Sequence, residues 1–425
     1  MRPRGVYTYS ALMNTFWHAG PRVIRLFSGV VASMAVARHL GPEDYGALCF
    51  ATMIAALAAG LVQLGSLEVV TKISATHPEQ IRSLLPAALR WRLFGAILAG
   101  GLIALIPFWL GQRAIYWVLA FLPLTLVPEC IEAVFYGRNE FRVIAPIRAI
   151  SAALGLILRL GLVTAGAGVE AFAMTTVLES GVAALMLLRF RRKSSDNPTG
   201  GVESSGLNLF QQSLPLAASG FLIAGVLRLD QFLLQALRPG VEMGYYYVVV
   251  RLFEVAGVLI PSYVSAILPD LARLRSFSQE AYREEMILIY RRIYQAGLLI
   301  AGASCLLAPW VIPLLFGSQY KASVPIFMAY SFAFPSFIVG SVRAMEFVIS
   351  NKNQNHFLVA LTLLPFQVFF CVVGIHWFGA AGLAGATALV SFISTTLFSM
   401  VIPALKESGD LQKEALKEFL CWKRC

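Results

Sequence analysis

The charged residues within one pair of long apolar segments constrain this chain more than any other feature of its sequence. Residues 214–268 consist of two membrane-length apolar runs around a break at residues 238–240, which predicts a hairpin of two membrane-spanning helices. The charged residues inside these runs are Arg228, Asp230, Arg251 and Glu254. A charge at the centre of a membrane helix costs roughly 2.5–3.5 kcal/mol, so four charges facing lipid would cost about 10 kcal/mol. We therefore expect these side chains to face water or a charged ligand.

The composition is that of a polytopic membrane protein. The 425 residues are 58% hydrophobic and only 13% charged, whereas a soluble domain has about 25% charged residues. A helix needs about 20 apolar residues to cross a bilayer. The runs of that length predict an all-α fold of about twelve transmembrane helices, at residues 12–37, 45–70, 86–110, 114–136, 144–166, 169–190, 209–236, 244–268, 287–315, 322–349, 356–377 and 380–404.

The distribution of lysine and arginine predicts how these helices are oriented. If the N-terminus is cytoplasmic, most of the 34 basic residues fall in cytoplasmic loops and their flanking turns, Arg92 and Arg148 among them. Such a bias marks the cytoplasmic side of a membrane protein. We therefore expect both termini in the cytoplasm. We interpret the net charge of +11 as a topology signal and not as a nucleic-acid surface.

A polar link divides the predicted spans six and six. Residues 191–207 have the composition of a linker, which would join an N-terminal six-helix bundle at residues 1–190 to a C-terminal six-helix bundle at residues 208–404. Residues 40–46, after the first span, resemble residues 237–245, after the seventh. Because each half has an even number of spans, such repeats would be parallel, related by an axis along the membrane normal.

Residues 405–425 are expected to form an amphipathic cytoplasmic tail. Charged positions alternate there with apolar ones, which are Leu411, Leu416, Phe419, Leu420 and Trp422. The pattern suits a short helix lying on the inner leaflet. A solvated helix end explains it equally well.

Polar residues recur every three or four positions on several predicted spans, which places them on one face of each helix. The stripe on the first span comprises Asn14, His18, Arg22 and Arg25. Arg251 and Glu254 repeat the spacing on the eighth span, as do Arg343 and Glu346 on the tenth. Stripes on helices of both halves predict a water-filled central cavity.

Arginines dominate these stripes. A guanidinium keeps its charge at any relevant pH and presents a planar fork that suits phosphate. The cavity should therefore favour an anion, such as a pyrophosphate head group. The predicted substrate-cavity residues are Arg22, Arg25, Arg228, Arg251 and Arg343.

The acidic residues and one histidine have two interpretations. Intramembrane ionisable groups are functional candidates, for example in coupling a proton or cation. They also serve as internal partners, as in a bridge between Arg251 and Glu254 or between Arg343 and Glu346. Residues near helix ends reach an interface instead. The predicted ion-coupling or pairing residues are His18, Asp230, Glu254, Glu346 and Glu129.

The sequence offers no enzyme signature. It lacks a His cluster suited to a metal, and it lacks a glycine-rich nucleotide loop followed by Lys. Cys421 and Cys425 have no neighbouring ligands that would complete a metal site. We therefore expect no catalytic residues, no metal and no cofactor.

Several short motifs, in this order and spacing, resemble the polysaccharide transporters of the multidrug/oligosaccharidyl-lipid/polysaccharide flippase superfamily, whose type members are the O-antigen flippases. The resemblance covers almost the whole chain. The motifs are LGPEDYG at residues 40–46, Leu64-Gly65, Arg228-Leu229-Asp230, Gly244-Tyr245, Pro269, FGSQY at residues 316–320 and FGAAG at residues 378–382.

The resemblance implies two six-helix bundles in a V-shaped alternating-access transporter with a cationic central cavity. It implies export of an undecaprenyl-pyrophosphate-linked oligosaccharide across the bacterial inner membrane, with membrane lipids and a polysaccharide polymerase as further expected partners. Twelve spans favour this branch over the lipid II flippases, which carry two more. A lipid II flippase and a cation-coupled drug or small-solute antiporter of the same superfamily remain alternatives. A membrane-embedded polymerase or acyltransferase would need a larger outer loop than the sequence provides.

Overall fold

The computed structural model describes the backbone of residues 9–63, 66–110, 114–190, 221, 224–350, 354–402 and 405–420. Side chains are described from Phe27 onward, with further gaps, the longest at residues 354–361 and 256–263. These residues form helices joined by short turns, and no strand occurs in them. This confirms the predicted all-α fold.

The chain divides into two compact units. One unit contains the residues up to Leu40 together with Ala47–Gly225, and the other contains Gly41–Gly46 together with the residues from Val226 onward. The helices of the first unit are α1 (Tyr9–Gln63, whose Gly41–Gly46 segment packs in the second unit), α2 (Ser66–Thr76), η1 (Pro78–Gln80), α3 (Ile81–Leu105), α4 (Pro107–Leu110), α5 (Ile115–Leu119), α6 (Leu122–Thr125), η2 (Val127–Glu129), α7 (Cys130–Gly137), α8 (Phe141–Thr164) and α9 (Val169–Arg189).

The second unit combines long helices with short ones. They are α12 (Leu229–Leu237), α13 (Val241–Phe277), α14 (Gln279–Phe316), η3 (Ser318–Tyr320), α15 (Ser323–Ser331), α16 (Ala333–Ile349), α17 (Gln354–Phe392), the π-helix η4 (Ile393–Leu397), α18 (Phe398–Val401) and α19 (Lys406–Leu420).

Among the described residues, seven helices are long and apolar enough to cross a membrane, and the bent pair α15 and α16 makes an eighth. Three of the seven are 37–40 residues long, and two of these, which belong to α1 and α17, each contain parts of two predicted spans. α1 is kinked at Gly41 and α17 at Gly379, where the backbone leaves the helical conformation. These kinks coincide with predicted breaks between spans.

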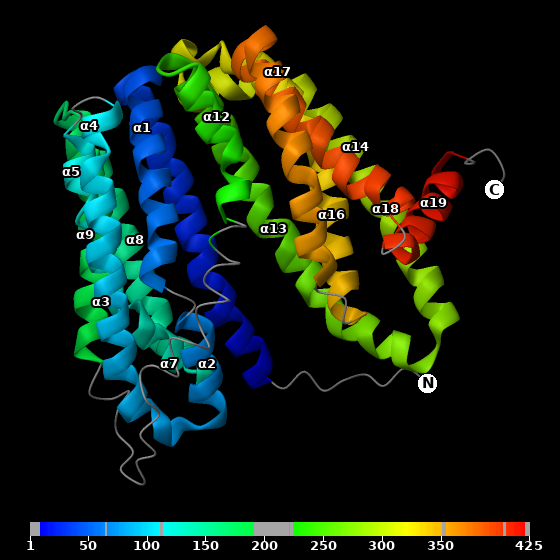
Figure 1. The fold of residues 1–425 in the computed structure, drawn as a ribbon, viewed down its shortest axis with the longest axis horizontal. Coiled ribbons are helices and arrows are strands. Elements are labelled where there is room, and N and C mark those ends of the chain that lie inside the picture. Colours follow the sequence, from blue (N-terminus) through cyan, green and yellow to red (C-terminus); the bar gives the residue numbers. More distant parts are fainter. Residues whose placement is uncertain are drawn as a thin grey trace. The chain divides into compact units, whose positions relative to one another are not determined.

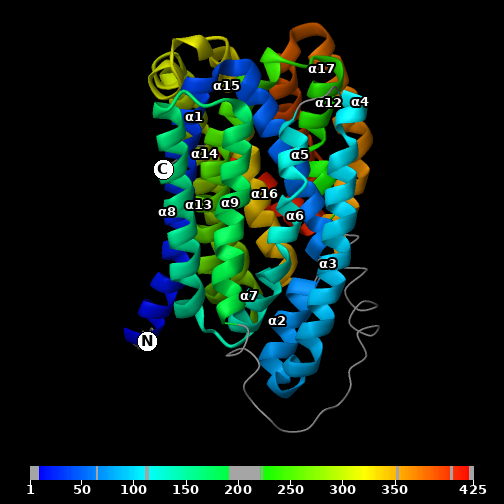
Figure 2. The same cartoon turned by 90° about the vertical axis from the view of Figure 1, so that its left-hand side faces the viewer.

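The first unit packs its helices around a buried apolar cluster. Leu84 on α3, Val134 and Phe135 on α7, Ile147 on α8 and Leu187 on α9 all belong to it. α8 and α9 run side by side, as Figure 2 shows. Arg159 of α8 pairs with Glu179 of α9 at 2.8 Å and adds a polar contact to this packing.

A clamp in the second unit joins the α12–α13 turn to the kink of α17. The Glu242 carboxylate accepts a hydrogen bond from the Ala380 backbone N–H at 2.7 Å and so caps the second arm of α17. Arg238 donates to Glu242 and to the His376 carbonyl oxygen. Gly379 has φ of +60°, and a Cβ there would lie 2.5 Å from Glu242 Oε2, so another residue would strain the backbone and displace the carboxylate.

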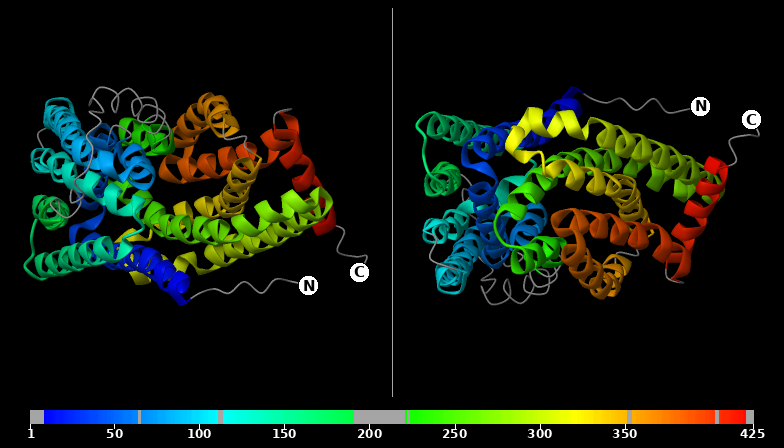
Figure 3. Two further views of the ribbon diagram at one scale, coloured as in Figure 1. Left: turned by 90° about the horizontal axis from the view of Figure 1, so that it is seen from below. Right: turned by 90° about the horizontal axis from the view of Figure 1, so that it is seen from above.

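The C-terminal helix α19 packs against α14 and α18 (Figures 1 and 3). Its buried face consists of Ser408, Gly409, Leu411, Gln412 and Ala415. The amphipathic pattern of the predicted tail therefore serves helix packing within the second unit.

A ladder of ion pairs flanks this packing. The pairs are Arg275–Glu407, Arg283–Glu414 and Arg291–Glu418, with the arginines on α13 and α14 and the glutamates on α19. All of these side chains are at least partly exposed, so each pair contributes only about 0–1 kcal/mol. The buried face of α19 must therefore contribute much of its docking.

We predict that Gly409→Val displaces α19 from its packed position against α14 and α18. An added Cβ at Gly409 would lie 1.9 Å from the Ser399 carbonyl oxygen, so either the helix or its neighbour has to move. Hydrogen–deuterium exchange of residues 406–420 should become faster than in the unchanged protein.

Gly302→Val on α14 is the matched control, because a Cβ there meets no atom within 4 Å. The control should leave the exchange of α19 unchanged. Equal exchange in the Gly409→Val variant and the unchanged protein would contradict the close approach to Ser399.

Candidate functional site

Three of the four charged residues in the apolar runs of residues 214–268 meet on the α12–α13 hairpin of the second unit. Arg228 is the N-cap residue of α12, and Arg251 and Glu254 lie one turn apart on α13. Glu254 Oε1 accepts from Arg228 Nη2 at 3.3 Å, and Glu254 Oε2 accepts from Arg251 Nη1 at 3.0 Å. The carboxylate therefore bridges two guanidinium groups from different helices. We call these three residues the arginine–glutamate triad.

The triad is accessible. Its side chains are 35%, 37% and 37% exposed for Arg228, Arg251 and Glu254. Two guanidinium groups and one carboxylate give the triad a formal charge of +1. An accessible positive group within membrane-spanning helices has the character expected of an anion-binding site.

Asp230 lies beside the triad in sequence but is turned away from it. Its side chain is buried and accepts a hydrogen bond of 2.5 Å from the Tyr246 hydroxyl. The next residue, Gln231, accepts from the Tyr247 hydroxyl at 2.9 Å. These two parallel bonds tie α12 to α13, so they fix the spacing between the helices that carry Arg228 and Arg251.

Arg343 and Glu346 lie elsewhere, in the interior of the second unit. Arg343 is 4% exposed and donates to the Ser394 carbonyl oxygen and to Ser399 Oγ. Glu346 is 2% exposed and accepts from the Tyr290 hydroxyl at 2.9 Å. The two residues take separate partners, and the structure does not bring Arg343 into contact with Arg228 or Arg251.

The network around Glu346 extends to α19. The Tyr290 hydroxyl also lies 3.2 Å from Ser408 Oγ, and the Tyr294 hydroxyl donates to Gln412 Oε1 at 3.2 Å. Gln412 in turn donates to Ser408 Oγ. A buried polar network of this kind requires that its members be hydrogen-bonded, and α19 supplies two of them.

In the first unit, Glu129 pairs with an arginine of α8. Glu129 Oε1 lies 2.6 Å from Arg148 Nη2, and Glu132 Oε1 lies 2.8 Å from Arg148 Nε. Arg148 belongs to α8, within a candidate membrane span, which agrees with its place in the predicted span at residues 144–166.

Arg92 is a second arginine of the first unit, and it lies inside the predicted span at residues 86–110. It lies in α3, is completely buried, and donates to Ser66 Oγ at 2.8 Å and to the Leu126 carbonyl oxygen at 3.2 Å. Leu126 separates α6 from η2, and its carbonyl oxygen also accepts from the Glu129 backbone N–H at 3.2 Å. The side chains of His18, Arg22 and Arg25, which were predicted to share one stripe, are outside the described residues.

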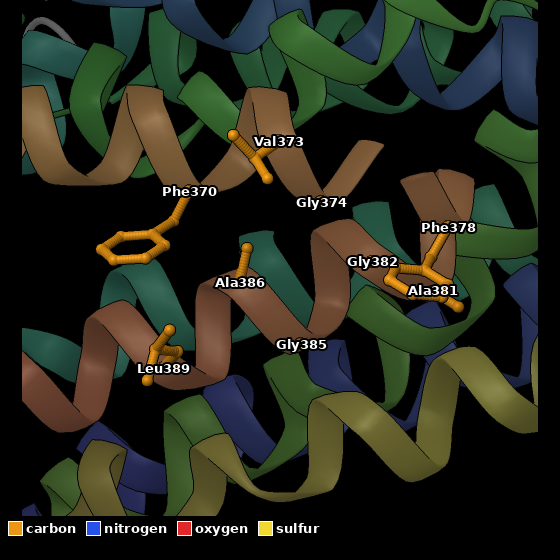
Figure 4. A pocket seen from close by; sticks show the side chains of 9 residues that line it. All are labelled: Phe370, Val373, Gly374, Phe378, Ala381, Gly382, Gly385, Ala386 and Leu389. Atoms are coloured by element: carbon orange, nitrogen blue, oxygen red, sulfur yellow. The ribbon is translucent and has the colours of Figure 1, made fainter. Parts of the chain in front are cut away.

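The second unit also has an apolar groove between the two arms of α17 (Figure 4). It encloses about 390 Å³. Its lining residues are Phe370, Val373, Gly374, Phe378, Ala381, Gly382, Gly385, Ala386 and Leu389. The arginine–glutamate triad takes no part in this lining, so the groove is not the charged site. Within the described part of the chain, no three His, Cys, Asp or Glu residues are placed to hold a metal ion.

The chain is a helical protein with several candidate membrane spans, and solved structures share its fold. A structure titled "Lipid II flippase MurJ, inward closed conformation" is similar with a TM-score of 0.67 and 14% identity, covering 96% of this chain and 92% of that chain. An inward-facing multidrug resistance MATE family transporter of the MOP superfamily is similar with a TM-score of 0.70 and 15% identity, covering 92% and 95%. An outward-facing MATE family transporter is similar with a TM-score of 0.65 and 16% identity, covering 95% of this chain and 96% of that chain.

A comparison of the sequence with models of protein families identifies the family. The family model for "Polysaccharide biosynthesis protein" matches residues 35–325, and the chain belongs to this family. No curated protein sequence matches the chain. Family and fold together confirm the resemblance on which the sequence analysis relied.

We predict that Arg148→Met destabilises the first unit. The substitution leaves Glu129 and Glu132 close together without their shared cation, and removing one partner of a buried ion pair costs about 3–5 kcal/mol. Thermal unfolding of the detergent-purified protein should occur at a clearly lower temperature. Arg142→Met, at an exposed position of the same helix, is the control and should unfold like the unchanged protein. Equal unfolding temperatures for the two variants would contradict the prediction.

Proposed function

We propose that this protein is a flippase that moves a lipid-linked oligosaccharide across the bacterial inner membrane for surface polysaccharide synthesis. The substrate class is an oligosaccharide on undecaprenyl pyrophosphate, and both termini of the chain lie in the cytoplasm. A polysaccharide polymerase would use the exported product. The membership of the polysaccharide biosynthesis family supports the substrate class, and the similarity to a lipid II flippase supports the mode of transport.

The observation that carries the proposal is the arginine–glutamate triad. Transport of a lipid-linked sugar requires a polar, accessible place for an anionic head group inside the membrane. Arg228 and Arg251 provide two guanidinium groups, each about a third exposed and held on adjacent helices. Guanidinium groups bind phosphate oxygens through paired charge-assisted hydrogen bonds. In this proposal the two arginines bind the pyrophosphate, and alternating access carries the head group across.

The other charged residues predicted from the sequence have supporting roles in this proposal. Arg22 and Arg25 remain predicted cavity residues, and His18 a predicted coupling residue. Asp230 and Glu346 are buried and hydrogen-bonded to tyrosine hydroxyls, which supports a role in holding the helices or in coupling. Arg343 is assigned to internal support, because its guanidinium is buried and directed at the backbone of η4.

We predict that Arg228→Gln and Arg251→Gln each lower the flipping rate about tenfold or more. A hydrogen bond to a charged group contributes about 1.5–3 kcal/mol, and each 1.4 kcal/mol is a factor of ten. The measurement is flipping of a lipid-linked oligosaccharide in proteoliposomes, with the amount of reconstituted protein determined for each variant.

Arg283→Gln is the matched control for this experiment. Arg283 also forms an arginine–glutamate pair, but on the α14–α19 side of the second unit. It should flip substrate at the unchanged rate. Normal flipping by both triad variants would contradict the assignment of the head-group site, and no flipping by the unchanged protein would contradict the proposed function.

A cation-coupled drug or small-solute antiporter is the second candidate. It is favoured by the similarity to a multidrug resistance MATE family transporter and by the buried carboxyl group of Asp230 near aromatic residues. On this hypothesis, expression in a drug-sensitive host should raise drug tolerance, and Asp230→Asn should abolish the gain. The flippase hypothesis expects no change in tolerance.

A further inference from the structure

We propose that Glu254 is an internal competitor of the substrate: its carboxylate holds the head-group site when no substrate is bound and returns to it when substrate leaves. This inference rests on the proposed function, because it assumes that Arg228 and Arg251 receive an anion. It adds a releasing residue to that site.

The geometry of the triad supports this role. Each carboxylate oxygen of Glu254 takes one guanidinium group, Oε1 from Arg228 and Oε2 from Arg251, at 3.3 and 3.0 Å. Glu254 therefore makes the same kind of bridge between two helices that a phosphate group would make. A phosphate and this carboxylate cannot both accept the same N–H groups, so their binding is mutually exclusive at those donors.

The exposure of the triad makes the exchange feasible. The three side chains are 35–37% exposed, and ion pairs between exposed side chains are weak. A phosphate presents more acceptor oxygens and more negative charge than a carboxylate. An arriving head group should therefore displace Glu254 from the guanidinium groups, while Glu254 remains close enough to compete for them.

The Glu254 carboxylate also stabilises the site when no substrate is bound. Two guanidinium groups alone would repel each other and move apart, because like charges near one another raise the energy of a site. Bridging by Glu254 keeps Arg228 and Arg251 near each other before substrate arrives. When the head group has to be released, the same carboxylate offers both cations a replacement partner. A transport site must bind well enough to load and weakly enough to unload.

The test compares pyrophosphate binding by the unchanged protein and by Glu254→Gln. The full-length purified protein in detergent is titrated with inorganic pyrophosphate at constant ionic strength, and Kd is measured by isothermal titration calorimetry. Loss of two weak ion pairs should lower Kd about tenfold. In proteoliposomes the same variant should reach half-maximal flipping at a lower substrate concentration but have a lower maximal rate, because release is slowed. Glu254→Ala should behave in the same way if Glu254→Gln is not recovered in folded form.

Glu179→Gln is the matched control. It removes one negative charge from an arginine pair in the first unit, which leaves the triad untouched. Tighter pyrophosphate binding by Glu254→Gln but not by Glu179→Gln supports the inference. Equal Kd values for Glu254→Gln and the unchanged protein overturn it while the head-group site stands. Equal tightening by both variants overturns it as a general charge effect. If neither the unchanged protein nor any variant binds pyrophosphate, both the inference and the head-group site are overturned. The proposed function is tested separately, by whether the unchanged protein flips lipid-linked oligosaccharide in proteoliposomes.

Discussion

The cost of placing a charge in an apolar helix governs the internal arrangement of both units. Six arginines of the apolar helices have polar partners within their own unit, although the partners differ. Arg148, Arg159, Arg228 and Arg251 contact carboxylates. Arg92 and Arg343 donate instead to backbone carbonyl oxygens and to serine hydroxyls. Both ways of satisfying a guanidinium lower the cost of burial, but they have different consequences for the fold.

Arginines that donate to backbone groups lie where helices are interrupted. Arg92 donates to Leu126, between α6 and η2, and Arg343 donates to Ser394 in the π-helix η4. An interruption frees carbonyl oxygens that would otherwise be bonded inside the helix. The Leu126 carbonyl oxygen also accepts from the Glu129 backbone N–H at 3.2 Å, so Arg92 is a second donor to it. A buried guanidinium beside an interrupted helix thus finds backbone acceptors that lower the cost of its burial.

The arginine–glutamate triad differs from these internal contacts in its exposure. Arg343 and Glu346 are at most 4% exposed, and Arg92 is completely buried, whereas the triad is about a third exposed. A buried charge with satisfied partners stabilises an arrangement of helices, while an accessible one retains the capacity to exchange partners. This contrast separates the charges that support the second unit from those proposed to bind a head group, and it is the basis for the competing role proposed for Glu254.

The sequence alone determined the all-α membrane fold, because long apolar runs have few other solutions. It also identified the breaks at Gly41 and Gly379 and the spacing of Arg251 with Glu254, since helical periodicity decides contacts within one helix. It did not decide contacts between helices. Glu254 also reaches Arg228, Glu346 contacts Tyr290 in place of Arg343, and Arg148 lies between Glu129 and Glu132. These partners are far apart in the sequence, so only the packing of one helix against another selects them.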